Sequence, residues 1–260
     1  MLRPRIIPCL LVRRGGLVKT VKFDEGKYVG DPINAVRIFN EKQVDELTVL
    51  DIDATVNGRE PDYAMIRNLA AECRMPLCYG GGVNTVEQVE KIVAMGVEKV
   101  AVSTAAVKNP QIIARMAESV GAQSIVVVID VAARGKGYEV RTENARRGSG
   151  LDPVQFARQM QDLGAGEIVV NSIDRDGGMQ GYDLPLLRAV REAVTVPLTA
   201  LGGAGSLGHI RELIREFGII GAAAGSLFVF KGVYRAVLIN YPKRAELDAL
   251  IAEEIGGSTK

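Results

Sequence analysis

Leu50-Asp51-Ile52-Asp53 and Ser172-Ile173-Asp174-Arg175-Asp176 are two acidic stretches that follow apolar runs in opposite halves of this 260-residue chain. A glycine-rich stretch comes after each of them, Gly80-Gly81-Gly82 in the first half and Gly202-Gly203-Ala204-Gly205 in the second. The acidic stretches lie 121 positions apart and the glycine stretches 122 positions apart. Two unrelated motifs that share nearly one offset indicate a duplicated half. Each copy then brings carboxylates and phosphate-binding glycines to one shared site.

Short apolar runs alternate with longer amphipathic stretches along the chain. The runs are rich in Val, Ile and Leu without a clear period of two, which is typical of parallel strands covered on both faces. Eight such alternations in 260 residues predict one domain, a (βα)8 barrel (TIM barrel). Its halves are expected at about 1–122 and 123–245, with a C-terminal tail at 246–260. A doubly wound open sheet is the alternative, which the repeat disfavours.

The expected strands are 5–11, 46–51, 77–79, 99–102, 124–130, 167–171, 198–201 and 221–223. The expected helices include 33–43, 63–72, 86–95, 111–120, 153–163 and 184–194. Several helices have clear beginnings, such as Asp152-Pro153, where an N-cap is followed by proline in the first turn.

Composition limits the possible partners. The formal net charge of +1 argues against nucleic acid or an anionic membrane, because either usually requires a basic surplus. No apolar run approaches the roughly 20 residues that a membrane-spanning helix needs. Cys9, Cys73 and Cys78 lack C-x-x-C spacing, and His209 is the only histidine. We therefore expect a reduced, cytoplasmic protein with no metal site and no cofactor.

Five aspartates follow apolar runs and are expected at the C-terminal rim of the barrel, where such barrels carry their chemistry. Any one of them could instead cap the next helix. Crowded carboxylates raise one another's pKa and can accept or donate a proton near neutral pH. Asp130 closes the run Ile125-Val126-Val127-Val128-Ile129 and is the best candidate for such a group. The five are Asp51, Asp53, Asp130, Asp174 and Asp176.

The glycine stretches predict two phosphate sites, because glycine lets backbone N–H groups and a helix N-terminus approach a phosphate closely. Ser103-Thr104 and Gly225-Ser226 come after later strands and can complete the two sites. Two sites in opposite halves predict a phosphorylated small molecule with anionic groups at both ends. A tight turn is the alternative for either glycine stretch taken alone.

These motifs together resemble the cyclase subunit of imidazole glycerol phosphate synthase, from about Arg3 to about Tyr241. The resemblance implies a lyase/cyclase-type subunit of a glutamine-dependent synthase. In that family, a glutaminase docks on the N-terminal face of the barrel. Its ammonia passes through the barrel to a two-phosphate ribulosyl intermediate, and the imidazole ring is then closed. The motifs that carry the resemblance are 6–10, Asp51, 80–82, 103–107, 172–177 and 202–205. The ligand contacts expected from it are Asp51, Gly82, Ser103, Thr104, Asp174, Asp176, Gly177, Gly203, Gly225 and Ser226.

Four charged residues at strand starts match the gate of that family. Arg5, Glu46, Lys99 and Glu167 each begin a run that is otherwise apolar. Charged residues at strand starts are often simply solvated. A ring of paired charges at the lower mouth is the favoured interpretation, and it predicts glutaminase docking near Glu98.

The site departs from the family where proton transfer is expected. Leu11 occupies the position of the aspartate that works opposite the residue matched by Asp130, and leucine cannot transfer a proton. Leu201, Asn171 and Ser103 stand where the family has serine, threonine and asparagine. Lys19, in the segment 13–31, matches the mobile lid of the family as a catalytic residue. An ordinary exposed lysine is the equal alternative for it.

The departures resemble a branch of cyclase-like paralogues found with surface-polysaccharide genes. That branch is associated with a glutaminase and a sugar amidotransferase that converts an acetamido group into an acetamidino group. The first hypothesis is therefore delivery of ammonia in amidino-sugar (lipopolysaccharide) biosynthesis. A working histidine-biosynthesis cyclase and a non-catalytic scaffold that activates the glutaminase are the alternatives. The segments that carry this resemblance are 10–11, 16–23, 28–32 and 225–230.

Overall fold

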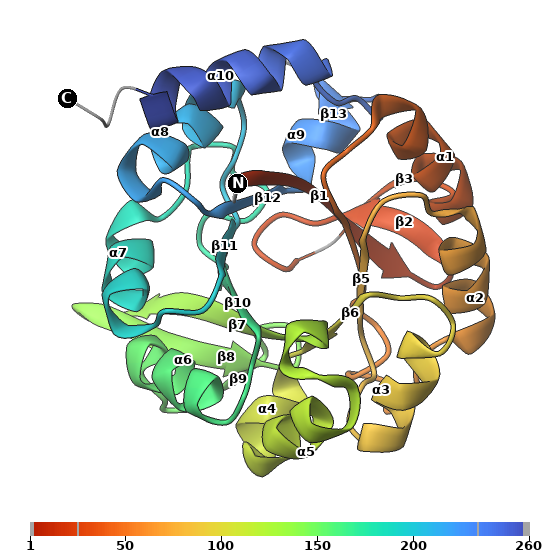
Figure 1. Cartoon of the computed structure of the whole chain (residues 1–260), viewed down its shortest axis with the longest axis vertical. Helices are drawn as coiled ribbons and strands as arrows, with labels where there is room; N and C mark the ends of the chain where they lie inside the picture. The colour runs from red at the N-terminus through yellow and green to blue at the C-terminus, as the bar shows by residue number, and fades with distance from the viewer. Residues whose placement is uncertain (1–2, 25, 233, 257–260) are drawn as a thin grey trace.

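A computed structural model describes residues 3–24, 26–232 and 234–256. Eight parallel strands pair in the order β10-β11-β12-β1-β4-β5-β6-β7, and β7 pairs again with β10 to close the barrel. Helices surround this closed sheet (Figure 1). The (βα)8 barrel predicted from the sequence is thereby confirmed. The barrel strands are β1 (Arg5–Arg13), β4 (Leu47–Asp51), β5 (Leu77–Gly80), β6 (Lys99–Val102), β7 (Ile125–Arg134), β10 (Glu167–Ser172), β11 (Leu198–Leu201) and β12 (Gly221–Ala224).

Capping side chains fix the start of several outer helices. Asp31, Asp152 and Asp183 each accept a hydrogen bond from a backbone N–H in the first turn, and proline follows early in all three helices. The helices are α1 (Pro32–Lys42), α2 (Tyr63–Glu72), α3 (Val86–Val93), α4 (Thr104–Lys108), α5 (Gln111–Val120), α6 (Pro153–Asp162), α7 (Leu184–Ala193), α8 (Leu207–Phe217), α9 (Ser226–Val229) and α10 (Arg244–Gly256), with a 3-10 turn at Ala122–Ser124.

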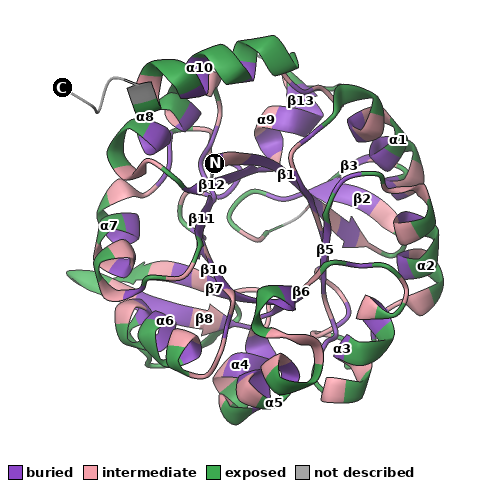
Figure 2. Cartoon of the chain, viewed as in Figure 1, coloured by how far each residue is buried: buried purple, intermediate pink, exposed green. Residues whose placement is uncertain are grey.

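Each barrel strand is buried on both faces. In β1, Ile6 packs in the large cluster between strands and helices, and Ile7 packs in a separate cluster inside the barrel. The helices turn their buried sides toward the strands and leave exposed sides outward (Figure 2). This two-layer burial explains why the strand sequences lack a period of two.

Two barrel strands are longer than the sequence predicted. β1 runs past Leu11 to Arg13 and pairs with β2 (Gly16–Lys19), which pairs with β3 (Lys27–Gly30). β7 runs past Asp130 to Arg134 and pairs with β8 (Gly137–Thr142), which pairs with β9 (Arg147–Gly148). Both extensions are antiparallel hairpins above the barrel, one in each predicted half. The half boundaries themselves stay a prediction.

The described residues of the segment predicted as a C-terminal tail belong to the helix α10. Leu247, Leu250 and Ile251 of α10 are buried, and Glu254 pairs with Arg215 of α8. An apolar stripe of this kind orders a helix by packing against a neighbour. Residues 257–260 of the predicted tail lie outside the described residues. A short hairpin, β13 (Phe230–Lys231) and β14 (Ala236–Val237), comes before α10.

Candidate functional site

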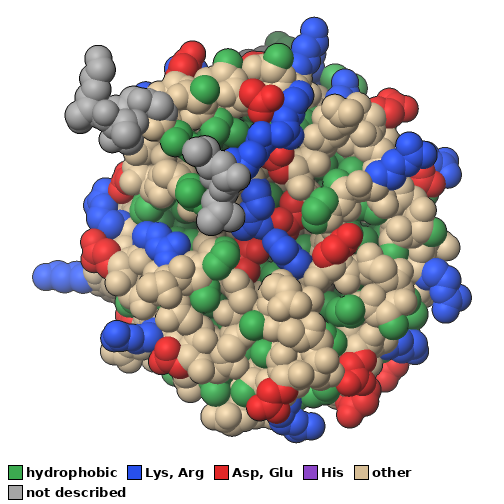
Figure 3. Space-filling model, viewed as in Figure 1, with side chains coloured by type: hydrophobic (Ala, Val, Ile, Leu, Met, Phe, Trp, Pro, Cys, Tyr) green, Lys and Arg blue, Asp and Glu red, His purple; other side chains and the backbone are tan. Residues whose placement is uncertain are grey.

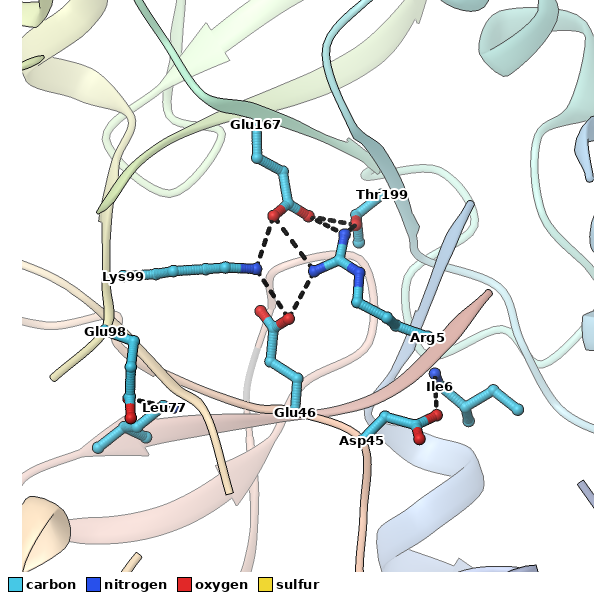
Figure 4. Close-up of polar contacts among 9 residues, drawn as sticks. All are labelled: Arg5, Ile6, Asp45, Glu46, Leu77, Glu98, Lys99, Glu167 and Thr199. Atoms are coloured by element: carbon cyan, nitrogen blue, oxygen red, sulfur yellow. Dashed lines mark hydrogen bonds and ion pairs between the residues drawn. The ribbon is translucent and has the colours of Figure 1, made fainter. Parts of the chain in front are cut away.

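Four charged side chains form a closed ring of ion pairs at the N-terminal mouth of the barrel (Figure 4). Arg5 Nη1 donates to Glu46 Oε2 at 2.5 Å, and Arg5 Nη2 donates to Glu167 Oε1 at 2.7 Å. Lys99 Nζ lies 2.8 Å from Glu46 Oε2 and 2.8 Å from Glu167 Oε2. Acidic and basic side chains accordingly gather at the hollow centre of this face (Figure 3). The ring predicted from strand-start charges is present.

Pairing favours the charged forms of Glu167 and Lys99. Burial alone would raise the pKa of Glu167, but the ion pairs with Arg5 and Lys99 hold it below its usual value. Burial alone would lower the pKa of Lys99, and the two glutamates raise it instead. The ring has two positive and two negative members, so its net charge is zero. A neutral, mutually paired ring closes the mouth without leaving an unpaired buried charge.

A narrow cavity lies inside the barrel directly above the ring. It has a volume of about 20 Å³, which is room for one water-sized molecule. Glu46 and Glu167 line one end of it, and Ile7, Val126 and Ala223 line its walls. The lining also includes two thiols, and burial raises the pKa of both, that of Cys9 to about 12. Above the ring, the wall of this cavity is therefore uncharged.

A larger pocket of about 120 Å³ lies at the C-terminal end of the barrel. This pocket and the cavity below share part of their lining, since five residues line both: Cys9, Leu50, Ala101, Val128 and Leu201. The predicted site residues that line this pocket are Leu11, Lys19, Asp51, Gly82, Ser103, Thr104, Asp130, Asp176 and Gly225.

Asp130 lies on the floor of this pocket. Its carboxylate accepts hydrogen bonds from Asn171 Nδ2 at 2.9 Å and from Ser103 Oγ at 3.3 Å. Burial raises its pKa to about 6, although both hydrogen bonds act in the opposite direction. Asn171 Oδ1 has no hydrogen-bond partner among the described residues. Asp130 thus offers a proton acceptor that works near neutral pH, and Asn171 Oδ1 offers a free hydrogen-bond acceptor for an N–H group.

The expected crowding of five rim carboxylates is only partly present. Asp51 accepts hydrogen bonds from the backbone N–H groups of Asp53 and Ala54, and burial raises its pKa. Asp53 pairs with Arg13 at 3.3 Å. Asp174 is exposed and accepts a hydrogen bond from the N–H of Ala133 at 2.7 Å, away from the pocket lining. This hydrogen bond stabilises the β7–β8 hairpin. The spacing of residues in the sequence did not distinguish such a local role from ligand binding.

The first predicted phosphate site opens into the pocket. Gly82, Ser103 and Thr104 all line it, and Ser103 and Thr104 stand at the N-terminus of the short helix α4. Gly82 has a φ of +75°, and a side chain there would lie 2.7 Å from the backbone oxygen of Arg59. Glycine is therefore required for the close approach of these two loops.

The second predicted phosphate site is covered by Lys19. Lys19 Nζ donates to Asp176 Oδ1 at 2.8 Å, and Thr20 Oγ1 lies 3.2 Å from Asp176 Oδ2. The lysine is only 5% exposed, so the ordinary surface lysine is excluded. It belongs to the paired strand β2 and not to a loop without secondary structure. Lys19 also lies against Gly225, since its Cε atom would be 3.0 Å from a Cβ atom added there.

The remaining predicted contacts lie behind this cover, outside the pocket lining. Gly177 packs beneath Thr20 and Val21, and Gly203 accepts a hydrogen bond from the N–H of Gly181 at 2.8 Å. Ser226 is buried, and its hydroxyl has no partner among the described residues. A free buried hydroxyl beside Gly225 is what a phosphate oxygen would use once the cover moves.

Replacing Gly203 with alanine is expected to lower the free energy of unfolding by about 2–4 kcal/mol. Gly203 has a φ of +105°, and a Cβ atom would collide with the backbone oxygen of Gly181. The control is Gly135→Ala, where φ is +59° and nothing lies within 4 Å. That change should cost about 1 kcal/mol from backbone strain alone. Urea unfolding measures both, and equal losses would contradict the close-approach argument.

Several pocket residues were not predicted from the sequence. Arg13, Phe23, Thr55 and Asn144 line the pocket from the loops and hairpins above the barrel. Asn144 Nδ2 donates to the backbone oxygen of Ile52, which ties the second half to the first. A basic or amide side chain in a loop has no periodicity to reveal it, so no sequence signal was available.

The described ranges 3–24, 26–232 and 234–256 offer no metal site and no membrane-spanning helix. No group of three or more His, Cys, Asp or Glu side chains in these ranges has an arrangement that could hold a metal ion. None of the helices in the same ranges combines the length and apolar character of a membrane-spanning segment.

Known proteins match this chain along almost its whole length. A family model described as "Histidine biosynthesis protein" matches residues 5–235. A Vibrio vulnificus protein, provisionally named imidazole glycerol phosphate synthase subunit hisF3, is 58% identical over 248 residues, which is 95% of both chains. A Leptospira interrogans protein, provisionally named subunit HisF of that synthase, is 55% identical over 252 residues, 96% of this chain and 99% of its own.

A third relative, from Pseudomonas aeruginosa, is provisionally named subunit hisF2 of the same synthase. It is 51% identical over 250 residues, 95% of this chain and 99% of its own. The matched region contains the charged ring, the internal cavity and the pocket described above. The chain therefore belongs to the histidine biosynthesis protein family, as a cyclase-like homologue of imidazole glycerol phosphate synthase subunits.

Proposed function

We propose that this chain takes up ammonia from a glutaminase on its N-terminal face and delivers it through the barrel to a nitrogen acceptor. The acceptor is a sugar whose acetamido group becomes an acetamidino group, in the synthesis of a surface polysaccharide. One observation carries the proposal: the ion-pair ring closes the mouth of a narrow cavity that shares five lining residues with the C-terminal pocket. A cytoplasmic location goes with this proposal.

The dimensions and lining of the passage suit ammonia in its neutral form. The cavity holds one water-sized molecule, and ammonia is of that size. An ammonium ion would lose its hydration among Ile7, Val126 and Ala223, and the two glutamates that line the cavity are already paired with Arg5 and Lys99. Opening one ion pair of the ring admits the molecule, and reclosing it keeps water out.

The pocket floor favours an acceptor other than the two-phosphate intermediate of the family. Leu11 lines the pocket where a second proton-transfer group is expected, and Leu50 and Leu201 extend this apolar floor. Asp130, whose pKa burial raises to about 6, remains in the floor as an acid or base. The nitrogen is therefore passed on to a sugar held by the amidotransferase.

The test uses the chain, its glutaminase and the sugar amidotransferase with glutamine labelled with 15N at the amide. Excess unlabelled ammonium chloride is added at the same time. We expect the amidino nitrogen of the product to retain the label, because ammonia inside the barrel does not mix with the solvent. A label diluted to its fraction in the bulk ammonium pool would overturn the proposal.

A second candidate, the histidine-biosynthesis cyclase, is favoured by the retained Asp130 and by the open first phosphate site. Leu11→Asp tests it, because this change restores a second carboxylate at the pocket floor. With ammonium chloride and the two-phosphate ribulosyl intermediate, we expect the variant to be about 10- to 100-fold faster than the wild type. Leu11→Asn is the control of equal size and should give no gain. A wild-type rate already equal to that of the variant would favour the cyclase.

A further inference from the structure

An unusual share of exposed apolar side chains lies on two hairpins. Eight large hydrophobic residues of the described chain are exposed, and five of them are on the β2–β3 hairpin or in the segment of the β13–β14 hairpin. Tyr234 is 93% exposed and Tyr28 is 65% exposed. Exposed apolar side chains are ordinary singly, but a contiguous group marks an interaction site. The five, called here the rim patch, are Val21, Tyr28, Tyr234, Val237 and Leu238.

The two hairpins touch each other, which brings the two parts of the patch close together. Lys27 Nζ donates to the backbone oxygen of Arg235 at 3.2 Å and lies 5.5 Å from the centre of the Phe230 ring. Arg235 Nη2 donates to the backbone oxygen of Gly177 at 2.9 Å, and Val21 packs against the same glycine. These contacts hold the apolar side chains of both hairpins over one part of the rim.

The rim patch borders the mouth of the pocket, at the opposite end from the ion-pair ring. The β2–β3 hairpin carries Lys19, Thr20 and Phe23 into the pocket lining, and its loop crosses the barrel axis (Figure 1). The β13–β14 hairpin follows α9, which begins directly after Gly225 in the same lining. Any molecule that leaves the pocket for solvent passes close to this surface.

The charges around the patch have mainly one sign. Lys22, Lys27 and Lys231 are exposed on the two hairpins, and Arg235 is half-buried between them. Asp24 is the one carboxylate among the described residues of the two hairpins. An apolar patch with a basic border fits a protein surface whose apolar centre is bordered by carboxylates.

We propose that the rim patch docks the nitrogen-accepting protein, through an apolar surface with an acidic border. This inference rests on the proposed function and specifies where the sugar amidotransferase binds: it covers the mouth of the pocket. A covered mouth passes neutral ammonia directly to the acceptor, whereas ammonia released into water is protonated and diluted. The two exposed tyrosines supply the large, rigid contacts that usually dominate such interfaces.

The experiment measures the Kd between the full chain, in complex with its glutaminase, and the purified sugar amidotransferase. Tyr234→Ser is expected to weaken binding at least tenfold, because it removes the most exposed aromatic side chain of the patch. Leu151→Ser is the matched control, since Leu151 is 37% exposed but comes just before α6, on the other side of the barrel from the β13–β14 hairpin (Figure 1). Equal affinities for the two variants would overturn the docking site.

A second arm tests the charge of the border. Lys231→Glu reverses one exposed cation and is expected to slow association severalfold at low salt. The difference should shrink at high salt, where surface charges are screened. A Lys231→Glu association rate equal to that of the wild type at low salt would contradict the acidic border of the partner.

The outcomes separate this inference from the proposed function. Labelled product from the wild type with no effect of Tyr234→Ser on binding would leave ammonia delivery standing and remove the docking site. Unlabelled product would remove the delivery function, whatever the binding result. Binding to phosphatidylglycerol vesicles, or self-association, that depends on Tyr234 while the amidotransferase is not bound would assign the patch to a membrane or to a second copy. Either result would also overturn the inference.

Discussion

Lys99→Met is expected to lower the free energy of unfolding by about 2–4 kcal/mol at pH 7 and to uncouple glutamine hydrolysis from product formation. The lysine bridges Glu46 and Glu167 at 2.8 Å each, and its side chain is only 19% exposed. Without it, two buried carboxylates share the single cation Arg5. The variant therefore leaves one negative charge unpaired at the mouth of the passage and opens one side of the ring.

The pH dependence follows from the glutamates. In the wild type, ion pairs lower the pKa of Glu167, so this carboxylate stabilises the fold above its unfolded pKa and loses that contribution as the pH falls through its folded pKa. The difference in the free energy of unfolding between variant and wild type should be largest at pH 7 and should shrink below about pH 4.5. Lys136→Met is the control, because Lys136 is exposed on the β7–β8 turn, and it should change stability by less than about 0.5 kcal/mol.

Two measurements check this prediction. Urea unfolding at pH 7 and pH 4 gives the stability difference, and parallel assays of glutamate release and product formation give the coupling. A Lys99→Met variant with unchanged coupling would count against a channel through the ring. An unchanged stability would contradict the ion-pair network itself.

Asp130→Asn is expected to raise the free energy of unfolding by about 1–3 kcal/mol at pH 8. Burial raises the pKa of Asp130 to about 6, so the folded chain binds more protons than the unfolded chain between about pH 4 and pH 6. Stability therefore falls as the pH rises through this window, and the loss is complete above it. Asparagine keeps a similar shape, accepts a hydrogen bond from Asn171 and donates one to Ser103.

Urea unfolding at pH 8 and pH 4 measures the effect, which should be small at the lower pH. Asp162→Asn is the matched control, because Asp162 is exposed on α6, and it should change stability by less than about 0.5 kcal/mol at both values. An Asp130→Asn variant no more stable than the wild type at pH 8 would show that the carboxylate is better solvated than its burial indicates.

Sequence reasoning located the barrel and both of its mouths from local patterns. A charge before each of four apolar runs, together with the resemblance to the family's gate, predicted the ring, since parallel strands place their starts at one end of a closed sheet. Glycine after a strand likewise located Gly82 in the pocket lining. The same reasoning did not separate Asp174, which serves the β7–β8 hairpin, from the aspartates of the pocket.

What the sequence determined alone was therefore the alternation of strands and helices, the repeat and the end of the barrel to which each motif belongs. These follow from the period, the spacing and the turn residues of short segments, which act locally. Only the tertiary structure decided that Lys19 pairs with Asp176 beside Gly225, that α10 packs on α8 and that the β2–β3 and β13–β14 hairpins touch. Each of these depends on contacts between residues far apart in the chain, and no local pattern records such a contact.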